Sequence, residues 1–183
     1  KDVLALDQTA LENFRRHKLS MVFQSFALLP HRTVLENVAF GLTIRKIAKD
    51  KRDAKAQNWI EKVGLKGYEN QFPAQLSGGQ QQRVGLARAL CTNPQILLMD
   101  EAFSALDPLI RSEMQQQLID LQKDLKKTVV FITHDLEEAL RIGNRIAILN
   151  DGRISQVGTP KEILENPADD YVTAFVRDVK RAF

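Results

Sequence analysis

Polar residues suited to a phosphate and metal site follow two apolar runs of the sequence. Asp100 and Glu101 follow the run Ile96–Met99, and His134 follows the run Thr128–Ile132. In a parallel α/β sheet, ligands bind beyond the carboxyl ends of the strands, so these side chains are expected at one edge. A strand-end Asp can hold Mg²⁺, a neighbouring Glu can deprotonate a water, and a His can hydrogen-bond a phosphate. Each residue taken alone is more often a solvated turn, a helix cap or a structural histidine.

A second candidate is the segment Leu76–Gln80 (LSGGQ), directly before a predicted helix. Ser77 is a favourable N-cap, and Gly78 and Gly79 let the backbone approach a ligand closely. The N–H groups of a first helical turn, together with the helix dipole, form an anion site. An ordinary capped helix shows the same pattern, so this segment by itself does not identify a site.

The apolar periodicity predicts alternating strands and helices. Strands are expected at Lys18–Gln24, Ile96–Met99, Thr128–Ile132, Arg145–Leu149 and Ile154–Val157. Helices are expected at Val34–Ile44, Asp53–Val63, Gln80–Leu90, Leu109–Leu125 and Leu136–Ile142, and twice more in the tail after Thr159. The second and third strands are continuously apolar, which is typical of strands covered on both faces. The alternation predicts a doubly wound α/β core with a parallel sheet, and Asn150-Asp151-Gly152 predicts a hairpin between the last two strands.

Composition excludes several classes of protein. The 183 residues suffice for one domain with a core, and 44% of them are hydrophobic and 27% charged. The net charge is only +3 and the basic residues are scattered, which argues against a nucleic-acid partner. The single cysteine, Cys91, excludes an intrachain disulfide and is expected in the core. No apolar run approaches a membrane-spanning length, so a membrane role would require a partner.

Four segments, in their order along the chain, resemble the ATP-binding-cassette (ABC) family. They are VFQ ending at Gln24, LSGGQQQR at 76–83, ILLMDEAFSALD at 96–107 and THD at 133–135. The resemblance extends over essentially the whole chain. It implies a P-loop NTPase-like ABC nucleotide-binding domain, with a mostly parallel sheet, helices on both faces and a helical subdomain. It also implies an ATP hydrolase with ATP and Mg²⁺ as cofactors.

The resemblance gives catalytic roles to four residues. Gln24 would lie in the Q-loop, where it would contact Mg²⁺ or the attacking water and signal to the membrane subunit. Asp100 would be the Walker B carboxylate in the Mg²⁺ shell, and Glu101 the general base. His134 would be the switch histidine that contacts the γ-phosphate of ATP.

Two further segments receive roles at a dimer interface. The signature loop would grip the γ-phosphate of ATP held by the partner subunit, and its residues would be Ser77, Gly78, Gly79 and Gln80. The D-loop would cross the dimer interface, and its residues would be Ser104, Ala105, Leu106 and Asp107.

The domain prediction treats 1–183 as a single partial ABC ATPase domain. Residues of about 25–90 would form the helical subdomain with the signature loop, about 91–158 the RecA-like core, and 159–183 a C-terminal helical tail. The family's G-x-x-x-x-G-K-[ST] (Walker A) motif is absent from the sequence. The family places that motif upstream of the Q-loop, so the chain is expected to begin downstream of it and to lack the strand that leads into it. Alone, it is expected to bind ATP weakly or not at all and to have negligible turnover.

The segments QSFALLPHRTV and DEAFSALDPLIRSEMQ resemble ATP-binding subunits of bacterial quaternary-amine (glycine betaine/proline) uptake systems. This resemblance implies a peripheral location at the cytoplasmic face of the plasma membrane. It also implies three partners: a transmembrane permease subunit, a second copy in a head-to-tail homodimer, and a periplasmic or lipoprotein substrate-binding protein. The alternatives are an importer ATPase for another small solute, a translation or DNA-repair ATPase of the same superfamily, and a non-catalytic fragment. The stretch between Gln24 and Ser77 is too short for the long coiled coil of chromosome-organising relatives.

Overall fold

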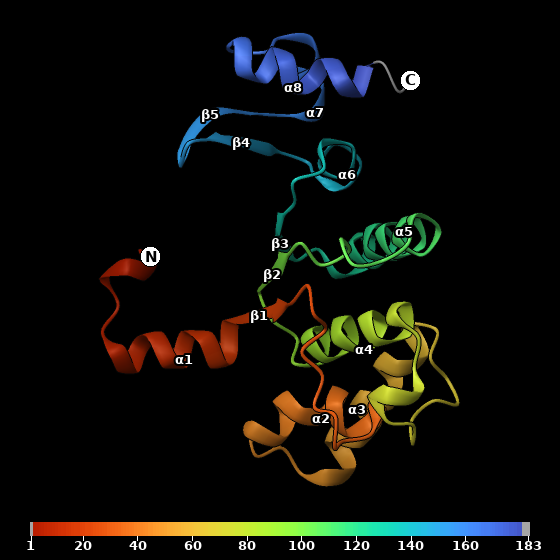
Figure 1. The fold of residues 1–183 in the computed structure, drawn as a ribbon. Helices are drawn as coiled ribbons and strands as arrows, with labels where there is room; N and C mark the ends of the chain where they lie inside the picture. Colours follow the sequence, from red (N-terminus) through yellow and green to blue (C-terminus); the bar gives the residue numbers. More distant parts are fainter. Residues whose placement is uncertain (1, 181–183) are drawn as a thin grey trace. The chain divides into compact units, whose positions relative to one another are not determined.

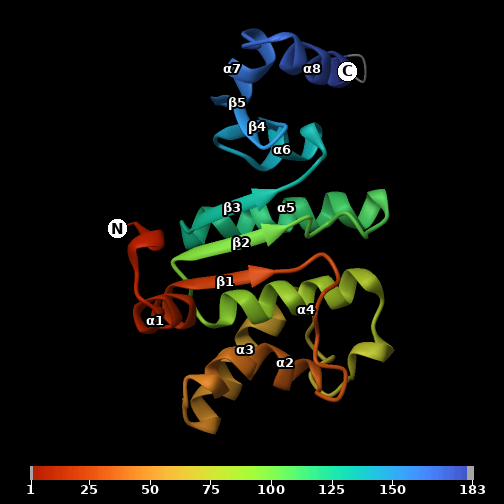
Figure 2. The same cartoon turned by 60° about the vertical axis from the view of Figure 1, so that its left-hand side comes forward.

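A parallel sheet of three strands organises the first part of the chain. Its strands are β1 (Leu19–Val22), β2 (Ile96–Asp100) and β3 (Thr128–Ile132), in the order β1-β2-β3 (Figures 1 and 2). Val22 pairs with Met99, and Asp100 pairs with Ile132. The carboxyl ends of all three strands therefore lie at one edge of the sheet, as the sequence predicts.

The computed structural model describes residues 2–180. Its contacts divide the chain into two units, Lys1–Ile132 and Thr133–Phe183, and each unit is described by itself. The first unit also contains η1 (Val3–Ala5), α1 (Gln8–Lys18), α2 (Val34–Ile44), α3 (Lys49–Lys62), η2 (Pro73–Gln75), α4 (Gly78–Cys91) and α5 (Pro108–Leu125). The second contains α6 (Leu136–Ile142), β4 (Ile146–Asn150), β5 (Arg153–Gly158), α7 (Pro160–Glu165) and α8 (Asp170–Lys180). The three-part domain organisation remains a prediction. None of the helices in the described part of the chain is long and apolar enough to cross a bilayer.

Helix α4 links the sheet to the helical arm of the first unit. It contacts β1 and α5, and it also packs against α2 and α3 (Figure 2). Its buried side includes Val84, Leu86, Ala87 and Leu90, the apolar face that the sequence predicts. The single cysteine, Cys91, is its last residue and is buried, which confirms its expected place in the core.

A tight joint forms where helices α1, α2 and α4 end. The guanidinium of Arg45, the residue after α2, donates to the carbonyl of Arg16 through Nε (3.1 Å) and Nη2 (2.7 Å), and to that of Thr92 through Nη1 (2.6 Å). A Cβ added at Gly41 would lie 2.4 Å from Thr92 Cγ2, so α2 and the end of α4 approach closely only because residue 41 is glycine. The Thr92 hydroxyl and Ser20 Oγ on β1 lie 2.9 Å apart, in hydrogen-bond contact. The guanidinium of Arg45 therefore joins the carbonyl ends of α1 and α4 to the end of α2, where a cation is favoured by the helix dipoles.

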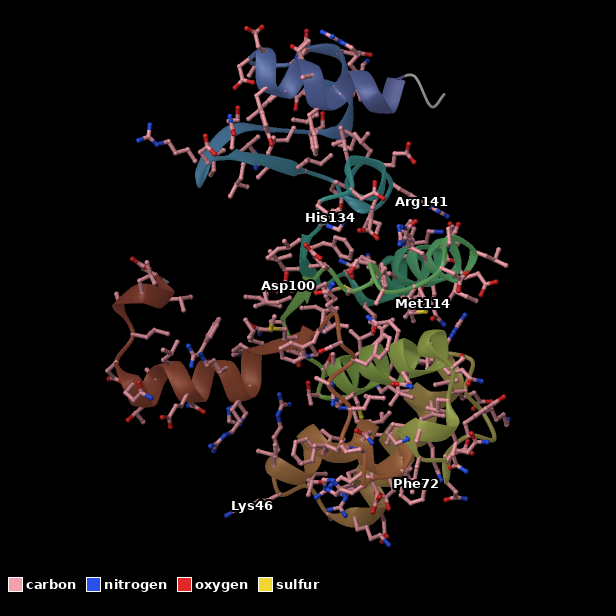
Figure 3. All side chains as sticks on the ribbon, in the orientation of Figure 1. Lys46, Phe72, Asp100, Met114, His134 and Arg141 are labelled. Carbon is pink, nitrogen blue, oxygen red and sulfur yellow. The ribbon has the colours of Figure 1, made fainter. Side chains whose placement is uncertain are left out.

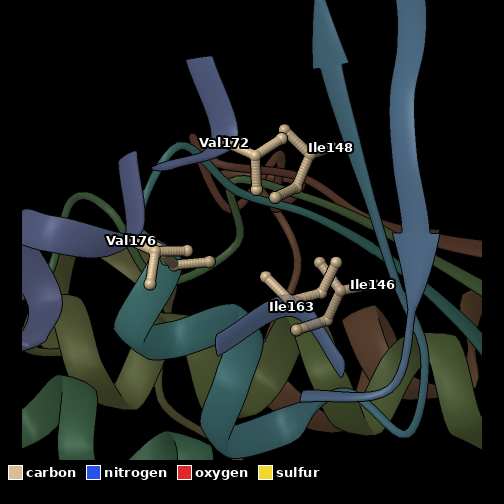
Figure 4. Close-up of a cluster of buried hydrophobic side chains, with 6 residues drawn as sticks. Ile146, Ile148, Ile163, Val172 and Val176 are labelled. Carbon is tan, nitrogen blue, oxygen red and sulfur yellow. The ribbon is translucent and has the colours of Figure 1, made fainter. Parts of the chain in front are cut away.

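The second unit is built on the predicted hairpin. Strands β4 and β5 pair antiparallel through the two-residue loop Asp151-Gly152, and both loop residues have positive φ (48° and 74°). Positive φ at both positions is the requirement of a type I′ turn, which Asp-Gly satisfies. One face of the hairpin packs against the helices of this unit (Figure 4). The buried residues of this core are Leu136, Ile146, Ile148, Ile163, Val172 and Val176.

Helix α1 is a departure from the sequence prediction, which placed no helix before the strand beginning at Lys18. Asp7 caps the helix by accepting a hydrogen bond from the Ala10 N–H (2.7 Å), and its last turn is basic. None of its residues is buried. Its apolar side chains Ala10, Leu11 and Phe14 are partly buried and recur at helical spacing, so the segment does carry the pattern of an amphipathic helix, which the prediction overlooked.

Strand β3 is a second departure. The prediction that both its faces are covered is wrong, because Val130 and Ile132 are 46% and 57% exposed. The alternate residues Val129 and Phe131 are partly buried, and the Phe131 ring lies 5.6 Å from that of Phe103. A continuous apolar run thus forms a strand with one solvent-exposed face.

Candidate functional site

Asp100 and Gln24 leave the sheet at the same edge. Asp100 is the last residue of β2 and is exposed (Figure 3). Gln24, also exposed, lies two residues beyond β1 in a turn closed by the hydrogen bond from the Phe26 N–H to the Phe23 carbonyl (3.3 Å). Adjacent parallel strands that end in register bring these two oxygen-bearing side chains to one edge, as predicted.

Glu101 is fixed by its backbone. Its φ is 44°, in the left-handed region that a non-glycine residue adopts at an energetic cost. Its N–H donates to the carbonyl of Ile132 at the end of β3 (2.9 Å), while the N–H and hydroxyl of Ser104 donate to its carbonyl (3.1 and 2.9 Å). Both backbone polar groups are therefore used, and they hold the residue at the junction of β2 and β3.

The predicted D-loop, residues 104–107, is held by a cation from helix α5. Arg111 donates to the carbonyls of Phe103 (3.2 Å), Ser104 (3.1 Å) and Leu106 (3.0 Å). Asp107 caps α5 by accepting from the Ile110 N–H (3.1 Å). Ala105 is exposed between these fixed points, and Leu106 is buried. These bonds hold the backbone of the loop against the start of α5.

The signature segment begins α4 through a capping box. Ser77 Oγ accepts from the Gln80 N–H (3.3 Å), and Gln80 Oε1 accepts from the Ser77 N–H (2.9 Å). An added Cβ at Gly78 would meet Phe26 Cζ at 3.7 Å and Leu106 Cδ2 at 3.9 Å, whereas one at Gly79 would meet Ile110 Cγ2 at 2.6 Å. The predicted signature segment thus lies against the loop after β1, at Phe26, and against the predicted D-loop, at Leu106.

Two side chains that sequence reasoning missed hold the loop after β1, residues 23–33, which contains the predicted Q-loop residue Gln24. Arg88 on α4 donates to the carbonyls of Phe26 (2.9 Å) and Ala27 (2.6 Å). The fully buried side chain of Asn37 on α2 accepts from the Leu29 N–H (2.8 Å) and donates to three carbonyls of residues 29–33 (3.0–3.1 Å). The helical spacing of Gly78, Gly85 and Arg88 on one side of α4 was the available signal for Arg88. For Asn37 the sequence offered none.

His134 lies near the start of the second unit, two residues after the end of β3. It is exposed, and the neighbouring Asp135 N–H donates to Thr133 Oγ1 (3.0 Å) while Asp135 caps α6 through the Glu138 N–H (3.2 Å) (Figure 3). Its position at the edge formed by Gln24, Asp100 and Glu101 belongs to the relation between the two units and stays a prediction.

The residues at the sheet edge fit a Mg²⁺ ion bound together with a nucleotide. Across residues 2–180, no three His, Cys, Asp or Glu side chains gather as a metal-binding group. Mg²⁺ in nucleotide sites is held by one or two protein oxygens, with phosphate oxygens and waters completing the shell. Asp100 and Gln24, exposed at adjacent strand ends, could supply those protein oxygens.

Comparison with known proteins decides the family. The family model described as "ABC transporter" matches residues 3–104, more than half of the chain. The chain belongs to the ABC transporter family. An ABC cassette solved as a dimer in a post-hydrolysis state with ADP and Pi superimposes with a TM-score of 0.73 at 39% identity, covering 85% of this chain and 68% of that one. The predicted fold class and family are therefore confirmed.

Two curated members of this ABC family are similar over nearly the whole chain. The glycine betaine transport ATP-binding protein of Bacillus subtilis (strain 168) is 59% identical over 95% of this chain. The glycine betaine/carnitine transport ATP-binding protein of Listeria monocytogenes (serotype 1/2a) is 56% identical over 100% of it. The chain spans 42% and 46% of the lengths of these two relatives.

Proposed function

We propose that this chain provides the hydrolytic sheet edge and the signature helix of an ABC importer ATPase that energises uptake of a quaternary amine such as glycine betaine. The observation that carries the proposal is the junction of β2 and β3, where Asp100 ends a parallel strand and Glu101 is held at positive φ by its own backbone bonds. The names of the similar transport proteins support the solute class.

Each side chain at the edge has one task in this proposal. Glu101 accepts a proton from the attacking water, and Gln24 orients that water. Asp100 holds Mg²⁺, which when bound with ATP neutralises charge on the phosphate oxygens. His134 donates a hydrogen bond to the terminal phosphate.

Two copies are needed for a complete site. Ser77, Gly78 and Gly79 of one copy would contact the phosphates of ATP bound to the other, with Gln80 holding Ser77 in the capping box. The N–H groups of the first turn of α4 provide the donors for this contact. The D-loop residues Ser104 to Asp107 would lie at the same interface. A dimeric solved relative supports this arrangement.

The remaining partners are a transmembrane permease subunit and, through it, a substrate-binding protein outside the membrane. The chain would then work as a peripheral subunit at the cytoplasmic face. Its 183 residues contain no Walker A motif, so we propose that these residues alone turn over ATP negligibly. Turnover is therefore tested in the full-length protein encoded by the gene.

The test replaces Glu101 by glutamine, which keeps the shape of the side chain and removes its basicity. In the full-length protein, Glu101→Gln is expected to lower kcat for ATP hydrolysis by about 100-fold or more, with ATP binding retained. Glu61→Gln is the matched control, because Glu61 is an exposed carboxylate on α3 whose salt bridge to Lys66 lies outside the site. A Glu101→Gln variant with kcat within twofold of the parent would refute the proposed base.

The solute is tested separately, with the permease and binding protein in proteoliposomes. ATP-dependent uptake of labelled glycine betaine, lost in Glu101→Gln, is the expected result. Uptake of a different small solute would keep the ATPase assignment and reject the quaternary amine. ATP hydrolysis that responds to ribosomes or damaged DNA, with no uptake, would reject the importer.

A further inference from the structure

The loop that follows β1 contains two consecutive non-glycine residues with positive φ. Phe26 and Ala27 have φ of 60° and 46°. L-residues adopt this conformation only when surrounding contacts hold it. The loop also contains Gln24, whose turn is closed by the bond from the Phe26 N–H to the Phe23 carbonyl, so the placement of Phe26 constrains the far end of the Gln24 turn.

Besides the local backbone bonds of the Phe26 and Ala27 N–H groups, Arg88 contacts the carbonyls of both residues. Its guanidinium donates from Nη2 to the Phe26 carbonyl (2.9 Å) and from Nη1 to the Ala27 carbonyl (2.6 Å). Burial lowers the pKa of Arg88, so this cation is partly withdrawn from water where it meets the two carbonyls. The rigid fork of a guanidinium binds two neighbouring oxygens at once, which a lysine ammonium cannot reproduce.

The same helix approaches the loop at two glycines. The nearest atom to a Cβ added at Gly85 would be the Phe26 carbonyl oxygen (3.7 Å), and at Gly78 it would be Phe26 Cζ (3.7 Å). Gly78, Gly85 and Arg88 therefore all bring α4 against Phe26. The loop after β1 descends past this helix on its way to α2 (Figure 2).

We propose that Arg88 is a positioning residue that locks the Q-loop to the signature helix, so that Gln24 and the Ser77 end of α4 move as one body. The part concerning Gln24 rests on the proposed function. The part concerning the loop rests only on the contacts of Arg88. A change that displaces α4 would thereby displace Gln24 from the sheet edge.

The first test measures hydrogen exchange of single amides in the full-length protein. Arg88→Lys keeps the positive charge but cannot donate to both carbonyls at once. Arg88→Met keeps the apolar part of the side chain but has no hydrogen-bond donor. In both variants the amides of residues 26–29 are expected to exchange about tenfold faster or more, with unchanged exchange in β2. Arg83→Lys is the matched control, because Arg83 lies on the same helix and bonds instead to Val63 O (3.1 Å) and Gln117 Oε1 (3.0 Å).

The second test asks whether Arg88 acts through Gln24. Arg88→Lys is expected to lower kcat about tenfold with little change in KM for ATP, and to have no further effect in a Gln24→Ala background. A residue that only supports folding would lower activity by the same factor in both backgrounds.

The outcomes separate the two proposals. If amide hydrogen exchange at residues 26–29 is unchanged in both Arg88→Lys and Arg88→Met, Arg88 does not hold the loop, whatever the ATPase activity. An equal loss of kcat with and without Gln24 overturns the positioning role. Absence of ATP hydrolysis in the parent protein rejects the proposed function, while the exchange measurement still decides the lock. Should Arg88→Met fail to fold, Arg88→Lys carries the test.

Discussion

Two neighbouring glycines at the start of α4 differ in what surrounds them. A Cβ at Gly79 would lie 2.6 Å from Ile110 Cγ2, but one at Gly78 would meet only ordinary contacts of 3.7 and 3.9 Å. Gly79→Ala is therefore expected to lower the free energy of unfolding by about 1–3 kcal/mol, since overpacking outweighs the helix propensity of alanine. Denaturant titration of both variants checks this.

Gly78→Ala is the internal control for that prediction. Its free energy of unfolding is expected to stay unchanged or to rise slightly. Equal destabilisation of both variants would mean that the start of α4 tolerates no side chain at all, and that the contact with Ile110 is not the reason.

Cys91 gives a prediction for alkaline pH. Burial raises the pKa of its thiol from 9.0 to about 11. The unfolded chain therefore releases this proton at lower pH than the folded protein, so the stability due to the protonated thiol is present below pH 9 and is lost as the pH rises toward 11. Between pH 8 and pH 10 the parent is expected to lose about 1 kcal/mol more unfolding free energy than Cys91→Ala. Parallel pH dependence of the two proteins, measured by denaturant titration, would contradict this.

At the scale of elements, Arg45 joins helices that end together. It donates to backbone carbonyls of Arg16 and Thr92 from the end of α2. Arg45→Met retains the apolar stem but leaves these carbonyls without their cation, so the free energy of unfolding is expected to fall by about 1.5–3 kcal/mol. Thermal and denaturant unfolding measure the change.

The neighbouring Lys46 provides the matched control for the joint. Lys46 is exposed at the next position of the same turn (Figure 3). Lys46→Met is expected to change the free energy of unfolding by less than about 0.5 kcal/mol. A loss for Arg45→Met no larger than this would show that the helix ends do not depend on the guanidinium.

At the scale of the whole molecule, apolar strand faces exposed to solvent stand out. Val130 and Ile132 on β3 are exposed, as are Leu149 and Ile154 on the hairpin of the second unit. Exposed apolar strands favour association between molecules. The double variant Val130→Thr/Ile132→Thr keeps residues suited to strands and is expected to bind less bis-ANS and to stay monomeric at higher concentration. Dye fluorescence and light scattering measure this.

A buried valine on the same sheet provides the comparison. Val22 on β1 is 1% exposed, so Val22→Thr buries a hydroxyl and is expected to lower the free energy of unfolding by about 1–3 kcal/mol. The β3 double variant is expected to stay within about 1 kcal/mol of the parent. A loss for the β3 variant as large as that for Val22→Thr would show that those residues are covered in solution.

The sequence by itself determined the family of the protein. It also determined the helices and strands whose apolar residues recur regularly on one face. The helix Val34–Ile44, the strand Thr128–Ile132 and the hairpin turn at Asp151-Gly152 follow from local patterns of apolar and turn residues, and the structure has them at the predicted places. Helix α1 was missed although Ala10, Leu11 and Phe14 give it an amphipathic pattern and Asp7 caps its start. Asp100 and Gln24 could be placed at one edge because the ends of parallel strands meet there.

Only the tertiary structure decided what holds those residues in position. Four side chains act by donating to backbone carbonyl oxygens, and no sequence pattern shows which carbonyls a side chain will reach: Arg88, Asn37, Arg111 and Arg45. The positive φ of Glu101, Phe26 and Ala27 likewise depends on contacts made across the fold. Side-chain types determine which chemistry is available, but hydrogen bonds between distant segments determine where it is held.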